Sequence, residues 1–216
     1  MARVKKRVGI LISGRGSNMA ALIDAARDPA YPAEIALVLS NRPDAGGLAR
    51  AEAAGIATGV VDHRGFPRDR PGHEAAIDAA LRAAGVEIVC LAGYMRVLTG
   101  LLVGRWAGRM LNVHPSLLPA FPGLDTHARA LAAGVKLHGC TVHLVSEGVD
   151  EGPILAQAAV PVLPGDTEDS LAARVLAQEH AIYKLALALL ASGRAPECPG
   201  PTAALLNPLP GASPLQ

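Results

Sequence analysis

Short, fully apolar runs in the first half of the chain alternate with stretches that have the spacing of amphipathic helices. The apolar runs predict strands over residues 8–12, 35–39, 58–61, 88–92 and 110–113. The stretches between them predict helices over residues 19–27, 48–54 and 74–84. Strands that are apolar at every position are typical of a parallel sheet covered on both faces. We therefore predict an α/β fold with helices on both sides of a mostly parallel sheet.

The second half of the chain has a different pattern. Residues 137–145 and 153–160 are longer and more alternating, which predicts two further strands, and the segment SEGVDEG between them resembles a functional loop. Residues 167–192 predict one long helix. We expect a single domain over residues 1–193, followed by a Pro- and Gly-rich tail over residues 194–216.

Composition narrows the class of protein. The 216 residues are half apolar and carry a net charge of +1, which gives no reason to expect a nucleic-acid or membrane partner. The three cysteines form no CxxC pair, so neither a zinc site nor a disulfide framework is indicated. The apolar run after the basic N-terminus ends at Ser13, which is too short for a signal peptide. No apolar stretch is long enough for a bilayer, and we expect a cytoplasmic protein that binds small molecules only.

The first predicted strand leads into the glycine-rich segment SGRGSN, residues 13–18, and then into a helix. Glycines permit a tight turn, and a helix N-terminus offers unpaired N–H groups to an anion. A dinucleotide fingerprint is incomplete, because Met19 replaces its third glycine and Ser40-Asn41 replace its acidic residue. The lysine of a Walker loop is also missing. A single phosphate on a small ligand fits better, and the alternative is an ordinary strand-to-helix turn.

Asn112 and His114 lie where the fifth predicted strand ends, before the proline-rich segment PSLLPAFPG. Side chains two residues apart on a strand point to the same face. This position is the carboxyl edge of the sheet, where α/β proteins bind their ligands. An amide beside an imidazole can hold an oxyanion while the histidine moves a proton, so we favour catalysis over a histidine held by local backbone.

A carboxylate near His114 would orient its ring and favour its charged form. Asp150 in the SEGVDEG loop is a candidate, and Glu147 and Glu151 are alternatives. The remaining histidines do not form a metal set, because His138 and His143 are five residues apart on a strand and should face opposite ways. We therefore expect no metal.

Five segments together resemble the formyltransferase family. They are LISGRGSN, LAGYMRVL, NVHPSLLPAFPG, SEGVDEGPI and GDTEDSLAARVLAQEHAIY, and they span about residues 7 to 192. HPSLLP is typical of the whole family, which includes methionyl-tRNA formyltransferase and formyltetrahydrofolate hydrolase. FPG with His127, and QEHAIY near the end, are similar to the branch that acts on glycinamide ribonucleotide.

The resemblance implies a fold and a set of site residues. The fold is a Rossmann-like three-layer sandwich whose mostly parallel sheet has seven strands, one of them antiparallel. The family's catalytic residues fall on Asn112, His114 and Asp150. Its binding residues for phosphoribosyl glycinamide fall on Gly16, Ser17, Asn18 and Glu179, where the glutamate holds the ribose.

The resemblance also implies a folate site, lined by Met95, Arg96, Val97 and Leu98 together with Asn112. A family arginine that contacts folate corresponds to Arg68 or Arg70, and we prefer Arg70. Two positions depart from the family pattern. Arg15 replaces a common asparagine and could add positive charge beside the phosphate, and Lys184 replaces a usual proline.

The implied reaction moves the formyl group of 10-formyltetrahydrofolate, a co-substrate, to the amine of N1-(5-phospho-D-ribosyl)glycinamide in purine synthesis. It needs no metal, and the enzyme is expected as a monomer or homodimer. The nearest alternative is a formyltetrahydrofolate hydrolase, which would not need the phosphate loop or Glu179. A non-catalytic binder of a phosphorylated sugar would leave Asn112, His114 and Asp150 unexplained. The incomplete fingerprint disfavours a nicotinamide oxidoreductase.

Overall fold

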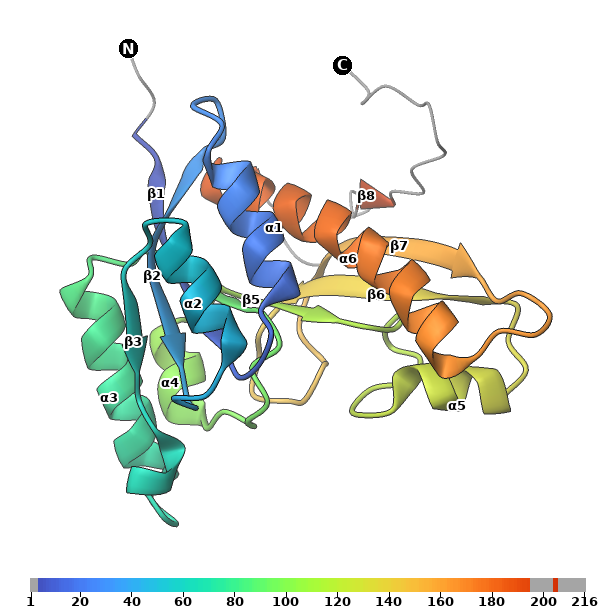
Figure 1. Ribbon diagram of the computed structural model, residues 1–216, viewed down its shortest axis with the longest axis horizontal. Coiled ribbons are helices and arrows are strands. Elements are labelled where there is room, and N and C mark those ends of the chain that lie inside the picture. The colour runs from blue at the N-terminus through green and yellow to red at the C-terminus, as the bar shows by residue number, and fades with distance from the viewer. Residues whose placement is uncertain (1–3, 195–203, 206–216) are drawn as a thin grey trace.

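One twisted sheet forms the centre of the computed structural model, which describes residues 4–194 and 204–205 (Figure 1). The strand order is β3-β2-β1-β4-β5-β6-β7-β8. The strands are β1 (Lys6–Ile12), β2 (Ala33–Ser40), β3 (Thr58–Val60), β4 (Ile88–Leu91), β5 (Met110–His114), β6 (Leu137–Leu144), β7 (Ile154–Pro161) and β8 (Ala204–Leu205).

The predicted seven-stranded, mostly parallel sheet is confirmed. Strands β1 to β5 pair in parallel, and β6 is antiparallel to both of its neighbours, β5 and β7. The two-residue strand β8 adds an eighth strand beside β7 and was not predicted. Apart from Arg194 and β8, the predicted tail lies outside the described residues.

Helices cover both faces of the sheet, as the uniformly apolar strands predicted. One apolar cluster packs the sheet against α1, α2 and α6, and a second packs it against α3 and α4. The short helices α4 and α5 were missed, because six or seven residues are too few to show a helical period. The helices are α1 (Ser17–Ala26), α2 (Gly46–Ala53), α3 (Arg70–Ala83), α4 (Gly100–Arg105), α5 (Thr126–Ala132) and α6 (Glu168–Ala191), with a 3-10 turn, η1 (His63–Gly65).

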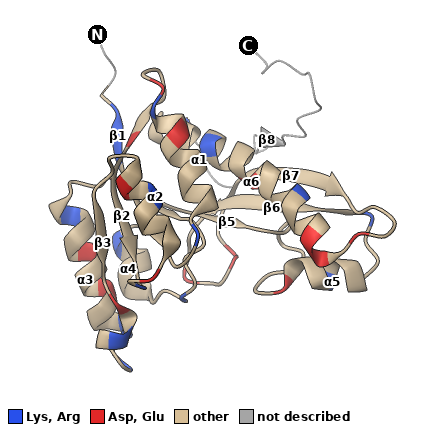
Figure 2. Ribbon diagram, viewed as in Figure 1, with Lys and Arg blue, Asp and Glu red and all other residues tan. Residues whose placement is uncertain are grey.

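The carboxyl ends of the parallel strands lie at one edge of the sheet. Ile12 pairs with Ser40, and Leu91 pairs with Asn112, so the loops after these strands begin side by side. Strands β4 to β7 carry no Lys, Arg, Asp or Glu, and Figure 2 shows these residues mainly on the helices and loops. In the part of the chain that the structure describes, no helix is both long and apolar enough to cross a membrane.

Candidate active site

His114 lies at the end of β5, and both of its ring nitrogens face oxygen atoms. Its Nδ1 is 3.3 Å from Oδ2 of Asp150, and its Nε2 is 3.0 Å from the carbonyl oxygen of Phe121. The His114 residue is 5% exposed. A doubly protonated imidazolium can donate to both oxygens at once, so this surrounding suits a charged histidine. Of the three acidic residues in the SEGVDEG loop, the structure places Asp150 against His114.

Asp150 is held in place from two directions. Its backbone has φ +59°, in the left-handed region that L-residues rarely adopt. Its Oδ2 accepts a hydrogen bond of 2.9 Å from the backbone N–H of Gly123. Gly123 and Phe121 both belong to the proline-rich segment after β5. That segment therefore fixes His114 through one of its carbonyl groups and Asp150 through one of its N–H groups.

Asn112 faces a histidine that the sequence reasoning had not included in the site. Asn112 and His143 are direct partners across β5 and β6, and Nδ2 of Asn112 is 3.2 Å from Nε2 of His143. His143 Nδ1 lies 3.0 Å from the carbonyl oxygen of Leu144, and its Nε2 lies 3.7 Å from Oδ1 of Asp150. Burial lowers the pKa of His143, opposed by the Leu144 carbonyl and by Asp150. A neutral His143 with its proton on Nδ1 therefore accepts a hydrogen bond from the Asn112 amide.

The loop after β1 ends in an uncapped helix N-terminus. Gly16 is the N-cap of α1 with φ +69°, and no side chain caps the helix. The first turn of α1 contains no acidic residue, so its free N–H groups and its dipole favour an anion. A Cβ atom on Gly16 would lie 3.2 Å from Cα of Gly47, which is itself bonded to Gly14 through N–H···O of 3.0 Å. The loop therefore requires glycine at position 16.

Asn18 and Glu179 meet beside this N-terminus. Nδ2 of Asn18 donates a 2.6 Å hydrogen bond to Oε2 of Glu179, and both residues are buried. Burial raises the pKa of Glu179, and the Asn18 hydrogen bond opposes that shift. Helix α6 thus brings a carboxylate from the far end of the sequence to the loop that begins at Ser13.

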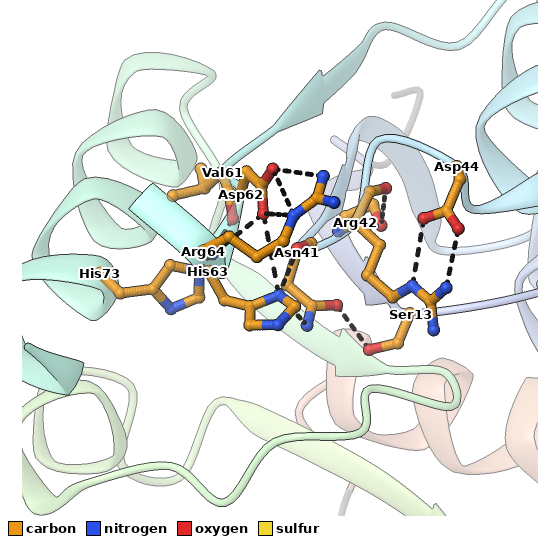
Figure 3. Close-up of polar contacts among 10 residues, drawn as sticks. Ser13, Asn41, Arg42, Asp44, Val61, Asp62, His63, Arg64 and His73 are labelled. Atoms are coloured by element: carbon orange, nitrogen blue, oxygen red, sulfur yellow. Dashed lines mark hydrogen bonds and ion pairs between the residues drawn. The ribbon is translucent and has the colours of Figure 1, made fainter. Parts of the chain in front are cut away.

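Polar contacts join the ends of β1, β2 and β3 (Figure 3). Ser13 Oγ donates a 2.6 Å hydrogen bond to Oδ1 of Asn41, and His63 Nδ1 is 2.8 Å from the Asn41 carbonyl oxygen. Ser13 Oγ also accepts a 2.8 Å hydrogen bond from the N–H of Met95. Ser13 therefore links Asn41, which occupies the position of the missing acidic residue after β2, to the loop after β4.

The predicted folate-lining residues lie in that loop after β4. Met95 is 65% exposed and Val97 is 58% exposed, so the segment offers apolar surface to a ligand. Arg70 is the first residue of α3, and Arg68 precedes it with φ +64°; both are exposed.

The loop that carries Asp150 passes close to the end of this segment. A Cβ atom on Gly100 would lie 3.2 Å from Oε1 of Glu147. Among the described residues, no three His, Cys, Asp or Glu side chains are grouped so that they could hold a metal ion.

Fold and site together are those of an α/β enzyme whose carboxyl edge offers an uncapped helix N-terminus, an exposed apolar segment and a buried histidine in contact with a carboxylate. The chain belongs to the formyl transferase family, whose model matches residues 6–187.

Named relatives share most of this chain. It is 45% identical over 185 residues to phosphoribosylglycinamide formyltransferase of Escherichia coli, covering 86% of this chain and 87% of that protein. It is also 51% identical over 189 residues to the human trifunctional purine biosynthetic protein adenosine-3, covering 88% of this chain and 19% of that protein. The chain thus spans less than a fifth of its trifunctional relatives, from 14% in Drosophila melanogaster to 19% in Homo sapiens.

Solved structures agree with the family. The crystal structure of phosphoribosylglycinamide formyltransferase from Brucella melitensis superposes with a TM-score of 0.83 at 61% identity, covering 88% of this chain and 97% of that one. Glycinamide ribonucleotide transformylase 1 from Symbiobacterium toebii gives a TM-score of 0.86 at 51% identity, covering 88% of this chain and 89% of that one.

Proposed function

We propose that this protein transfers the formyl group of 10-formyltetrahydrofolate to the amine of N1-(5-phospho-D-ribosyl)glycinamide, a step of de novo purine synthesis. The observation that carries the proposal is the contact between His114 and Asp150, with Asn112 beside them, in a chain similar to named formyltransferases over most of its length. We place the reaction in the cytoplasm, with small molecules as the only partners and a monomer or homodimer as the working unit.

The chemistry begins when the glycinamide amine attacks the formyl carbon and a tetrahedral intermediate forms. The side-chain N–H of Asn112 and the protonated ring of His114 stabilise the developing oxyanion. Donors aimed at such an oxyanion typically contribute a factor of about 10² to 10³ in turnover. Asp150 keeps His114 charged and oriented, and a proton moves, directly or through water, from the attacking amine to the leaving folate nitrogen. The C–N bond to folate then breaks, with no covalent enzyme intermediate.

His143 serves this chemistry through Asn112. An amide carries two N–H groups, and the one that faces His143 Nε2 at 3.2 Å leaves the other free for a ligand oxygen. Because the Leu144 carbonyl holds the proton on Nδ1 of His143, Nε2 stays an acceptor. The hydrogen bond therefore fixes the rotation of the Asn112 amide.

Substrate binding is divided between two parts of the carboxyl edge. Gly16, Ser17 and Asn18 hold the phosphate of the nucleotide at the start of α1, and Glu179 holds its ribose hydroxyl groups. Met95, Arg96, Val97, Leu98 and Asn112 line the folate site, and Arg70 binds the folate carboxylate, for which a guanidinium is well shaped.

The test uses purified protein with 10-formyl-5,8-dideazafolate, a stable folate analogue, and follows deformylation by absorbance with and without glycinamide ribonucleotide. Turnover only in the presence of the nucleotide is expected, because the amine is the acceptor. Deformylation without the nucleotide would replace the transferase with a hydrolase. No turnover in either mixture, with the nucleotide still bound, would leave a binding protein and remove the catalytic role of His114.

A further inference from the structure

One buried carboxylate joins the start of α3 to the segment before α4. Glu74 is 2% exposed and follows Arg70 by one helical turn, on the same face of α3. Its Oε1 accepts a 2.7 Å hydrogen bond from the N–H of Thr99. Its Oε2 accepts from the Thr99 hydroxyl at 2.6 Å and from the N–H of Leu102 at 3.3 Å. Thr99 is the N-cap of α4 and directly follows residues 95–98.

These contacts hold the folate segment against α3. A buried carboxylate is stable only where donors replace its water, and all three donors to Glu74 come from residues 99–102. A second sign of this packing comes from His73, the neighbour of Glu74. Burial lowers the pKa of His73, the Val61 carbonyl opposes that shift, and the charge of Arg96 adds to it, which places Arg96 within electrostatic range of the start of α3.

We propose that Glu74 is a positioning residue for the folate co-substrate. It fixes the separation between Arg70 on α3 and the Met95–Leu98 segment without touching the ligand itself. This inference rests on the proposed function, in which Arg70 takes the folate carboxylate and the segment lines the rest of the site. A ligand held at both ends binds well only where its two subsites stay at a set distance.

Asp78 provides a matched control on the same helix. It lies one turn after Glu74 and is 4% exposed. Its carboxylate accepts from Nη1 of Arg105 at 2.8 Å and from Nε1 of Trp106 at 3.0 Å, both at the far end of α4. It also accepts from Nε of Arg82 at 2.9 Å. Asp78 therefore ties the same two helices together through Arg82, Arg105 and Trp106, away from the residues before α4 that line the folate site.

The experiment compares Glu74→Gln and Asp78→Asn with the parent protein. Each variant is assayed for the Kd of 10-formyl-5,8-dideazafolate by titration calorimetry, for the KM of both substrates and for thermal unfolding. Both variants should unfold at lower temperature than the parent. Glu74→Gln should raise the folate Kd and KM by about tenfold, because one lost hydrogen bond to a charged group is of that order. The nucleotide KM of Glu74→Gln should stay within about twofold of the parent value. The folate Kd of Asp78→Asn should also stay within about twofold, since neither quantity depends on the Glu74 contacts.

Two results would overturn the inference. One is a folate Kd in Glu74→Gln that equals the parent value, and the other is an equal rise in Asp78→Asn, which would mean general loosening of α3 against α4. A parent protein that binds no folate analogue would overturn the proposed function and this inference together. If Glu74→Gln does not fold, Thr99→Val removes the same 2.6 Å hydrogen bond from the hydroxyl side. This variant should raise the folate KM by about threefold. An unchanged folate KM in Thr99→Val would also contradict the positioning role of Glu74.

Discussion

Strands β1 to β4 run parallel and offer the carboxyl edge mainly turns and backbone groups. The N-terminus of α1 presents its N–H groups behind Gly16, and Met95 is anchored through its own N–H to Ser13. Strand β6 runs antiparallel to both β5 and β7, and these three strands offer side chains that meet across strands, with Asn112 opposite His143. The first region is thus suited to binding and the second to moving protons.

The difference follows from how the strands are connected. Parallel strands are joined by helices, so each loop starts at the same edge and can present glycines and helix ends to a ligand. An antiparallel pair places two side chains directly opposite each other, close enough for a hydrogen bond between them. If this division is real, substitutions in the second region should reduce kcat, and substitutions in the first should raise KM.

The largest effect is expected for Asn112→Ala in the antiparallel region. Loss of the amide should lower kcat by about 10² to 10³, with both KM values within about threefold, because an oxyanion donor acts mainly in the transition state. Steady-state kinetics with both substrates measures this, and circular dichroism checks that the variant is folded. A kcat within a few-fold of the parent would remove the oxyanion role and with it the distinction between the two regions.

The free energy of unfolding should also depend on pH through a residue of the antiparallel region, His138 on β6. Burial, followed by repulsion from His127, lowers the pKa of His138 to about 4. The unfolded chain binds a proton near the ordinary pKa of about 6.5, which the folded protein does not bind. The contribution of His138 to the free energy of unfolding is therefore fully present above about pH 6.5. It is lost as the pH falls toward 4, which lowers the free energy of unfolding by up to about 3 kcal/mol.

The variant His138→Phe should remove this part of the pH dependence, because phenylalanine does not titrate and packs against Phe121 as His138 does. Urea unfolding of the parent and the variant at several pH values between 7 and 4 measures it. Equal losses of unfolding free energy in both proteins would show that His138 is not responsible.

Some features of the two regions could be predicted from the sequence. In the parallel region, one contiguous segment holds both the glycine turn and the helix start, so residues 13–18 could be singled out directly. Asn112 and His114 could be paired for the same reason, since residues i and i+2 of one strand share a face. Their catalytic role, like that of Asp150, stays a prediction.

Contacts between segments that are far apart in the sequence could not be predicted in this way. His143 becomes the partner of Asn112 only through the register of β5 with β6, which the sequence does not specify. The choice of Asp150 over Glu147 depends on a left-handed backbone conformation that the sequence does not specify. Glu179 was assigned to the ribose of the nucleotide by family resemblance, and its bond to Asn18 spans 161 positions of the chain.

A smaller effect is expected for Gly16→Ala in the parallel region. An alanine at φ +69° is strained, and its Cβ would press on Cα of Gly47, so the loop should shift away from the phosphate. The KM for glycinamide ribonucleotide should rise by about tenfold, since a strained backbone costs of order 1–3 kcal/mol, while kcat falls much less. Gly46→Ala is the control, because a Cβ there meets nothing within 4 Å. A fall in kcat with unchanged KM would place the loop with the chemistry instead.

The smallest effect tests whether the two binding loops are coupled. Ser13→Ala removes the 2.6 Å bond to Asn41 and the acceptor of the 2.8 Å bond from Met95. Both the nucleotide and the folate KM should rise by about threefold, because one hydroxyl supports the loops after β1 and β4 and such a bond contributes about 1 kcal/mol. Ser170→Ala, which removes a hydroxyl from the capping box at the start of α6, is the control for a general loss of stability. A rise in only one KM would mean that Ser13 supports a single loop, and that the parallel region binds its two substrates independently.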